Sequence, residues 1–249
     1  MSDIINLKPE AVWRFFDEIT RIPRPSKKEE KIVAYLIDFA KSRSLEYRKD
    51  STGNVVIRKG ASPGMENRPV VVLQSHVDMV CEKRGDVNFH FDTDPIRTRV
   101  EDGWVRAEGT TLGADCGIGM AAELADDLAH GPVECLFTVD EETGLTGAFG
   151  LGEGMLSGKY LINLDSEDEG QLFIGCAGGI DTVATMRYRQ EEAPKNFDFF
   201  RIDIGGLLGG HSGDDIDKGR ANSNKLLARF LWLAARQTEM RLVYLDGGN

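Results

Sequence analysis

Residues 70–73 are apolar at every position, and three of the four are valine. β-branched residues favour strands, and a strand that has no polar face must be covered on both sides. Such strands are typical of parallel sheets, in which crossover connections place helices against the sheet faces. This run therefore constrains the fold strongly, because it requires a central strand and enough chain to cover it.

Strand and helix patterns alternate around this run. Short apolar runs predict further strands at residues 55–57, 133–139 and 160–164. Apolar residues at helical spacing predict helices at residues 12–19, 32–40 and 118–128. Ser26 and Glu29 match a capping box before the second helix, and Asp102-Gly103 predicts an added antiparallel hairpin. The alternation predicts a three-layer α/β domain with a mixed sheet.

The pattern changes near residue 182. Alternating apolar residues predict strands at residues 183–188, 199–204 and 241–245, with one long amphipathic helix at residues 222–236. We therefore predict an α/β domain at residues 1–181 and a smaller, partial α+β domain at residues 182–249. The β-β-α-β order predicts that this second domain is incomplete in this chain.

Composition narrows the classes of partner. The 249 residues carry a formal net charge of -11, with acidic residues scattered along the chain. Nucleic acids and anionic membranes attract basic patches, so neither is an expected partner. No run approaches the roughly 18 apolar residues that suggest a membrane span, and no secretory signal pattern opens the chain, so we expect a cytoplasmic protein. The four cysteines lack C-x-x-C spacing and predict reduced, mostly buried thiols.

Histidine and acidic residues follow three of the predicted strands directly. They are His76 and Asp78, then Asp140, Glu141 and Glu142, and finally Asp165. A further acid, Asp115, lies in a glycine-rich loop that precedes a helix. Each alone has an ordinary explanation as a cap, a turn residue or a solvated loop residue. Ligands of open α/β sheets gather beyond the carboxyl ends of strands, so together these side chains predict a site for a divalent cation such as zinc.

Longer motifs resemble a known family. Ser75-His76-Val77-Asp78, Gly113-Ala114-Asp115, Asp140-Glu141-Glu142-Thr143-Gly144 and Leu164-Asp165 occur in the order seen in the di-zinc metallopeptidase superfamily. The segments Phe91-Asp92-Thr93-Asp94-Pro95-Ile96, Phe173-Ile174-Gly175-Cys176 and Gly209-Gly210-His211-Ser212-Gly213 resemble one branch of it, the carnosinase-like aminoacyl-histidine dipeptidases. The resemblance covers essentially the whole chain as the N-terminal portion of such an enzyme. It implies that residues 1–181 are a catalytic domain that lacks its C-terminal part and that residues 182–249 are an incomplete lid domain.

The resemblance implies a set of metal ligands. Asp115 would bridge two zinc ions, with His76 and Asp165 on one ion and Glu142 on the other. Other divalent metals are compatible with this set. The resemblance also implies a cis peptide bond after Asp115 and a further histidine ligand near the C-terminus of the catalytic domain, for which this chain has no candidate. Cys116 stands where the family usually has Asn or Asp, which would bring a thiol near metal or oxidant.

It also implies three catalytic roles. Asp78 would orient His76, and Glu141 would be the general base that acts on a zinc-activated water. His211 would polarise the substrate carbonyl from the lid domain. The implied reaction is metal-dependent hydrolysis of dipeptides, preferably Xaa-His such as β-alanyl-histidine, by an enzyme that forms a homodimer through its lid. A broader dipeptidase, an acyl-amino-acid deacylase, a non-catalytic metal-binding fragment and a structural dimerisation fragment remain alternatives.

Overall fold

The structure is a computed structural model that describes residues 3–166, 168–176, 178, 180, 182–209, 215 and 217–247. The chain divides into two units, Met1–Cys176 and Ala177–Asn249. The helices of the first unit are η1 (Asp3–Asn6), α1 (Glu10–Thr20), α2 (Glu30–Ser42), α3 (Ala114–Leu124), α4 (Glu141–Gly144) and α5 (Thr146–Phe149). Each described helix is too short or too polar to cross a membrane.

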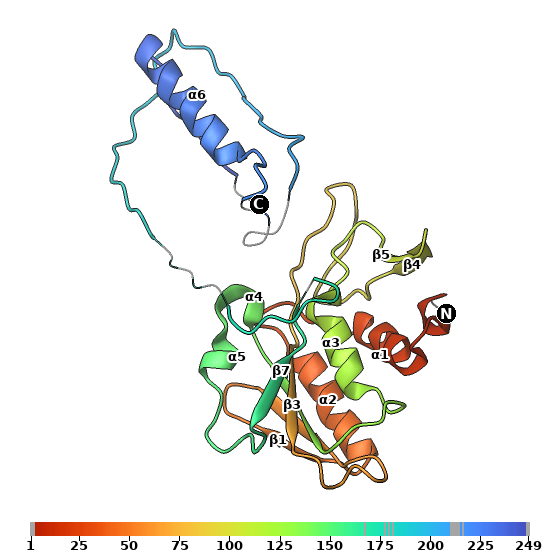
Figure 1. Cartoon of the computed structure of the whole chain (residues 1–249). Helices are drawn as coiled ribbons and strands as arrows, with labels where there is room; N and C mark the ends of the chain where they lie inside the picture. The colour runs from red at the N-terminus through yellow and green to blue at the C-terminus, as the bar shows by residue number, and fades with distance from the viewer. Residues whose placement is uncertain are drawn as a thin grey trace. The chain divides into compact units, whose positions relative to one another are not determined.

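The first unit contains a mixed five-stranded sheet (Figure 1). Its strands, in spatial order, are β1 (Glu46–Lys49), β2 (Val55–Lys59), β6 (Val133–Thr138), β3 (Val71–His76) and β7 (Tyr160–Asn163). β6, β3 and β7 run parallel, whereas β1 and β2 pair antiparallel. The predicted hairpin is β4 (Thr98–Glu101) and β5 (Trp104–Ala107). The predicted mixed α/β class is thus confirmed.

Helices α1, α2 and α3 cover one face of the sheet (Figure 1). Alternate residues of β2 and β6, such as Ile57 and Phe137, point into this helical core, and both are fully buried. On the opposite face Val56 and Leu136 pack against Met155 and its neighbours. In the part of the chain that the structure describes, the predicted third layer is therefore this short irregular segment and not a layer of long helices.

Some local predictions were wrong. The helix predicted at residues 118–128 lies within α3, whose backbone is non-helical at Asp115 and Cys116, but it ends at Leu124 because the backbone becomes extended at Ala125. Lys59 Nζ donates to the carbonyl oxygens of Glu123 and Ala125, which the helix end leaves without intrahelical partners. β1 was not predicted because its sequence, EYRK, has no apolar run.

The predicted capping box is also absent. Glu29 occupies the N-cap position of α2 without a capping hydrogen bond from its side chain. The Ser26 hydroxyl donates to Asp78, and Glu29 Oε1 accepts from the amides of Lys27 and Asp140. Both side chains therefore bind the loops near the strand ends instead of the first turn of the helix.

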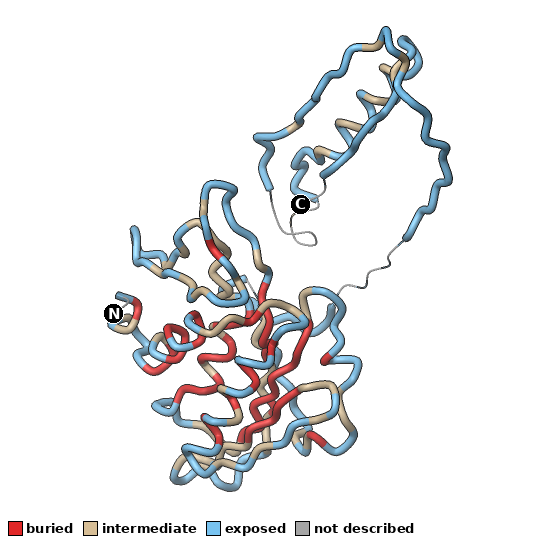
Figure 2. The backbone as a smooth tube through the Cα atoms, turned by 180° about the vertical axis from the view of Figure 1, so that it is seen from behind, coloured by how far each residue is buried: buried red, intermediate tan, exposed pale blue. Residues whose placement is uncertain are grey.

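The second unit contains α6 (Ser223–Gln237), which agrees with the predicted helix. Its N-cap is Asn222, whose Oδ1 accepts from the Lys225 amide at 2.9 Å. The strands predicted at residues 183–188, 199–204 and 241–245 do not form, and their apolar side chains are mostly exposed (Figure 2). A strand needs a paired neighbour and a covered face, and the described residues of this unit supply neither.

Candidate metal centre

The site lies where the three parallel strands end. The pairing register places His76, the last residue of β3, opposite Thr138 of β6. Gln74 of β3 pairs with Asn163 of β7, so Asp165, two residues further on, lies level with His76. The strand ends therefore bring His76, Asp165 and the loop after β6 to one edge of the sheet, as the sequence predicts.

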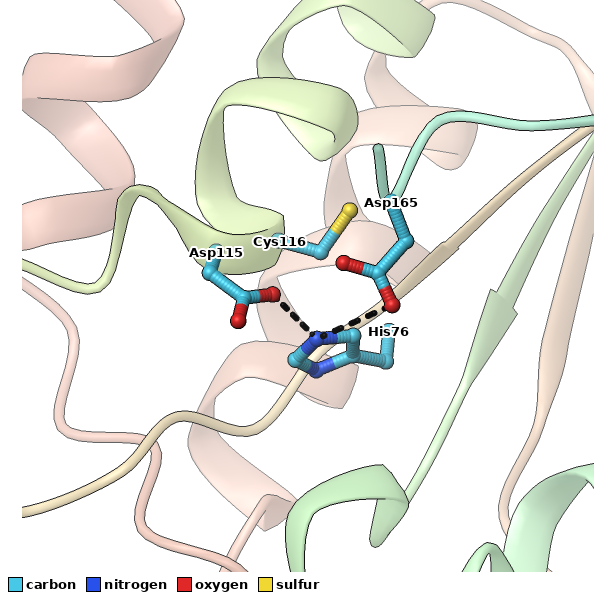
Figure 3. Close-up of side chains that lie close together, drawn as sticks. All are labelled: His76, Asp115, Cys116 and Asp165. Carbon is cyan, nitrogen blue, oxygen red and sulfur yellow. Dashed lines mark hydrogen bonds and ion pairs between the residues drawn. The ribbon is translucent and has the colours of Figure 1, made fainter. Parts of the chain in front are cut away.

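His76 is the centre of this arrangement (Figure 3). Its side chain is 1% exposed, and its Nε2 lies 2.8 Å from Oδ1 of Asp115 and 3.9 Å from Oδ2 of Asp165. The carboxylates of Asp115 and Asp165 are 43% and 25% exposed. One nitrogen and two carboxylates thus converge at a point that an ion could reach from outside.

Asp115 reaches the site from the start of α3. Gly113 adopts the left-handed conformation at φ 70°, and Asp115 has an extended ψ of 116° inside the nominal helix. The Asp115–Cys116 peptide bond is cis, as the resemblance implies. The thiol of Cys116 lies within 4.8 Å of the ligand atoms of His76, Asp115 and Asp165, which agrees with a thiol near the metal site. Cys116 is buried, however, so the expected exposure of this thiol is wrong.

The fully buried carboxylate of Asp78 holds several parts of the site together. Its Oδ1 lies 3.2 Å from His76 Nδ1 and accepts from the Glu141 amide at 3.0 Å. Its Oδ2 accepts from the Ser26 hydroxyl at 2.7 Å and from the Glu142 amide at 3.2 Å. Asp78 therefore fixes the ring of His76 and the first residues of α4 at the same time.

Glu141 and Glu142, the first residues of α4, also lie close to His76. One ligand atom from each of these three residues lies within 4.8 Å of the other two. Burial and the neighbouring Asp115 carboxylate raise the pKa of Glu142. A carboxylate with a raised pKa close to other acids is an electrostatic cost that a bound cation would relieve.

The pKa values of the central residues indicate how much negative charge surrounds His76. Burial disfavours the imidazolium, but the hydrogen bonds to Asp115 and Asp78 outweigh it and raise the pKa of His76 to about 10. Burial would raise the pKa of Asp78, yet its hydrogen bonds with His76 and the Glu141 amide lower it to about 2. Burial and the nearby Asp115 raise the pKa of Asp165. In the absence of a cation, the site therefore retains protons at neutral pH.

The donor set fits zinc. Zinc in proteins takes histidine nitrogen together with carboxylate oxygen, and three protein ligands leave a position open in catalytic sites. His76, Asp115 and Asp165 provide such a set, and Glu142 adds a further carboxylate close to His76. Carboxylates also accept other hard divalent cations, so the donor set allows more than one metal.

The structure brings together six of the seven residues singled out by sequence, namely His76, Asp78, Asp115, Glu141, Glu142 and Asp165. His211 lies outside the described residues. Sequence reasoning missed the part played by Arg24, Ser26 and Glu29, whose side chains bind the backbone or carboxylates of the site loops. Ser26 and Glu29 match the pattern of a capping box, so their sequence predicts a helix cap and not contacts with the site loops.

Comparison with known proteins finds similar peptidases. The model of the family described as "Peptidase family M20/M25/M40" matches residues 72–215. The cytosol non-specific dipeptidase of Escherichia coli (strain K12) is 46% identical over 253 residues, covering 100% of this chain and 52% of that protein. The crystal structure of an aminoacylhistidine dipeptidase from Vibrio alginolyticus matches with a TM-score of 0.69 and 44% identity, over 97% of this chain and 50% of that one.

A more distant solved structure shares the fold. The aminopeptidase PepT from Bacillus cereus ATCC 10987 matches with a TM-score of 0.53 and 26% identity, over 64% of this chain and 44% of that one. The chain spans about half the length of the dipeptidases that it matches.

Proposed function

The chain belongs to peptidase family M20/M25/M40, and on that premise we propose that it acts in the metal-dependent hydrolysis of dipeptides. The observation that carries the proposal is the convergence of His76, Asp115 and Asp165 at the ends of parallel strands. Two relatives that match the chain over nearly its whole length are both named as dipeptidases.

We propose a preference for dipeptides with a C-terminal histidine, such as β-alanyl-histidine. The name of the solved relative from Vibrio alginolyticus supports this preference. The name of the Escherichia coli relative, a non-specific dipeptidase, favours a broader range of dipeptides as the second candidate. A direct comparison of several dipeptides separates the two.

Two zinc ions are the proposed cofactors. His76 and Asp165 would hold one ion, Glu142 the other, and Asp115 would contact both. When bound, the metal pair supplies Lewis-acid activation of water and stabilises developing negative charge. Among the described residues, a histidine nitrogen is available to only one of the two positions, so we expect that position to bind zinc more tightly.

Protein side chains would carry the proton transfers and the orientation. The Glu141 carboxylate accepts a proton from the attacking water and donates it to the leaving nitrogen. Asp78 accepts from His76 Nδ1 and so presents Nε2 to the site. We assign to His211 the stabilisation of the oxyanion that develops on the substrate carbonyl.

The remaining expectations stay proposals. We assign the catalytic role to residues 1–181 and the lid role to residues 182–249, with a homodimer formed through the lid. A cytosolic location is supported by the name of the Escherichia coli relative.

The proposal is tested by zinc titration and hydrolysis assays on the purified chain. His76→Ala should lose tight zinc binding, whereas Glu141→Gln should keep zinc and lose roughly 10²- to 10⁴-fold in turnover. Glu153→Gln is the matched control, because Glu153 is exposed and lies outside the site. Hydrolysis that survives Glu141→Gln unchanged would refute the assigned base.

A rival function is distinguished by the same assays. Zinc binding by the wild-type chain without hydrolysis of any dipeptide would identify it as a metal-binding fragment. Hydrolysis without a zinc requirement would instead contradict the metal centre.

A further inference from the structure

Arg24 is a buried cation that lies beside the candidate metal centre. It is 2% exposed and belongs to the segment between α1 and α2. Its Nη1 donates to the carbonyl oxygens of Val77 at 3.0 Å and Asp78 at 2.6 Å, and its Nη2 donates to the carbonyl oxygen of Gly113. One guanidinium therefore joins two loops that are more than thirty residues apart in sequence.

The three carbonyl groups lie next to metal-ligand candidates. Val77 and Asp78 directly follow His76, and Gly113 precedes Asp115 by two residues. The guanidinium thus holds the backbone after β3 against the backbone that opens α3. The separation of His76 Nε2 and Asp115 Oδ1, 2.8 Å, depends on how these two segments are placed.

The surrounding backbone leaves space for this side chain. A Cβ atom added to Gly113 would lie 2.5 Å from Arg24 Nη2, and one added to Gly117 would lie 2.7 Å from the same atom. Real Cβ atoms essentially never approach so closely, so both glycines permit the guanidinium to sit against α3. The space beside Gly113 and Gly117 therefore accommodates the planar, branched guanidinium of Arg24.

Neighbouring residues of the same segment bind other parts of the site. The Ser26 hydroxyl donates to the Asp78 carboxylate at 2.7 Å. Glu29 Oε1 accepts from the Asp140 amide at 3.0 Å, immediately before Glu141. The segment therefore contacts all three of the loops that carry His76, Asp115 and Glu141.

We propose that Arg24 is a positioning residue that sets the relative placement of His76 and Asp115 and thereby the affinity of the centre for zinc. This role rests on the proposed function, because it presupposes a metal at that site. Arg24 acts through backbone carbonyls and touches neither substrate nor metal. Residues that orient metal ligands typically change metal affinity by about 10- to 100-fold when replaced.

The branched shape of arginine is central to the role. Burial lowers the pKa of Arg24 to about 10, so the group keeps its charge at neutral pH. Lysine would keep that charge but has a single ammonium group in place of a planar fork, and it could not hold carbonyls on two sides in the same geometry. Methionine would keep much of the stem and remove both charge and fork.

These substitutions separate positioning from two simpler effects. A purely electrostatic effect predicts normal zinc affinity for Arg24→Lys and tighter zinc binding for Arg24→Met, because a positive charge near the ion is removed. A purely structural effect predicts a lower Tm for both variants with an unchanged zinc Kd of the folded chain. Positioning predicts weaker zinc binding for both.

Arg58 provides the matched control. It is a half-buried arginine of β2 whose Nε donates to Glu134 at 3.0 Å and whose Nη1 donates to Glu46 at 2.9 Å. Arg58 pairs with Glu134 near the start of β6, at the opposite end of that strand from the site. Its replacement should affect stability without affecting the metal centre.

The experiment measures the zinc Kd by competition with a chromogenic chelator, and the Tm without zinc, for the full chain and for Lys and Met variants at both positions. We expect Arg24→Lys to weaken zinc binding by about 10- to 100-fold and Arg58→Lys to change it by less than about twofold. If Arg24→Met does not fold, Arg24→Lys decides the question alone.

An unchanged or tighter zinc Kd in folded Arg24→Lys would overturn the positioning role while leaving the metal centre intact. A wild-type chain that binds no zinc would overturn the proposed function, and this role with it.

Discussion

The two units of the chain contain similar apolar sequences with opposite outcomes. In the first unit, Val55 and Val56 of β2 are 0% and 1% exposed, because β2 pairs on both sides and packs on both faces. In the second unit, Val183 and Met186 lie in a segment whose alternating apolar residues also predict a strand, and they are 89% and 84% exposed. Apolar periodicity therefore indicates what a segment can become, whereas neighbouring strands and a covering layer decide whether it becomes a strand.

The largest difference between the units is expected in stability. Phe137→Ala should lower the free energy of unfolding of the first unit by about 3 to 5 kcal/mol, because Phe137 is fully buried in the helical core. Phe200→Ala, at a position that is 84% exposed, should change it by less than about 0.5 kcal/mol. Urea denaturation of both variants measures the contrast. Equal effects would show that Phe200 is buried in solution.

Replacing an acidic residue should change zinc affinity in the first unit but not in the second. Asp78→Asn removes a carboxylate that accepts from Ser26 and from two amides of α4, and it should weaken zinc binding by about 10- to 100-fold. Asp203→Asn removes an exposed carboxylate of the second unit that pairs with Arg201. Isothermal titration with zinc should show no change for this control. A similar loss in both variants would point to general electrostatics instead of the site.

The pH dependence of zinc binding should report on the first unit alone. The pKa of His76 is raised to about 10, so zinc must displace a proton from it at neutral pH. The association constant should therefore rise by about tenfold for each pH unit between about pH 6 and 8, and more steeply if Asp165 also releases a proton. Titrations at several pH values measure the slope. A flat profile would show that His76 is already neutral without metal.

The same raised pKa has a consequence for stability without zinc. A folded-state pKa above the ordinary value of 6.5 stabilises the folded chain below that value. This contribution is lost as the pH rises from 6.5 towards about 10. Urea denaturation of wild type and His76→Gln across this range checks the sign, since the substitution should remove the dependence.

The smallest effect is expected at the cap of α6. Asn222→Ala removes the acceptor for the Lys225 amide and should destabilise the helix by about 1 kcal/mol. Amide hydrogen exchange should accelerate within α6 and remain unchanged in the first unit. Asn222→Asp is the control, because it retains the acceptor oxygen. Faster exchange in α1 or α2 would show that the effect of the cap extends beyond the second unit.

The central strands and their polar ends were predictable because each run is apolar and the site residues follow it directly. Parallel strands end at the same edge, so the convergence of His76, Glu142 and Asp165 follows from the strand pattern. The helix of the second unit was predictable from its amphipathic spacing and from the Asn222 cap. These features are local in sequence.

Features that depend on distant partners were not predictable. Arg24 binds backbone carbonyls, and a carbonyl group is present whatever the side chain, so its partners leave no signature in the sequence. Ser26 and Glu29 match a helix-capping pattern equally well, and only the approach of Asp78 and Asp140 gives them other partners. The predictions of three strands in the second unit were wrong because strand pairing depends on distant residues, which a local pattern does not show.

The pairing of β7 with β3 has one more consequence. All four residues of β7 are exposed, so burial hardly specifies which residues of β3 they pair with. A slip of one residue would turn Asp165 to the other face of the sheet, away from His76. An ion held by both side chains would stabilise only the correct register, by about 2.7 kcal/mol at a zinc concentration of 100 times its Kd. Metal availability would thus select the alignment of an edge strand that hydrophobic packing leaves loosely determined.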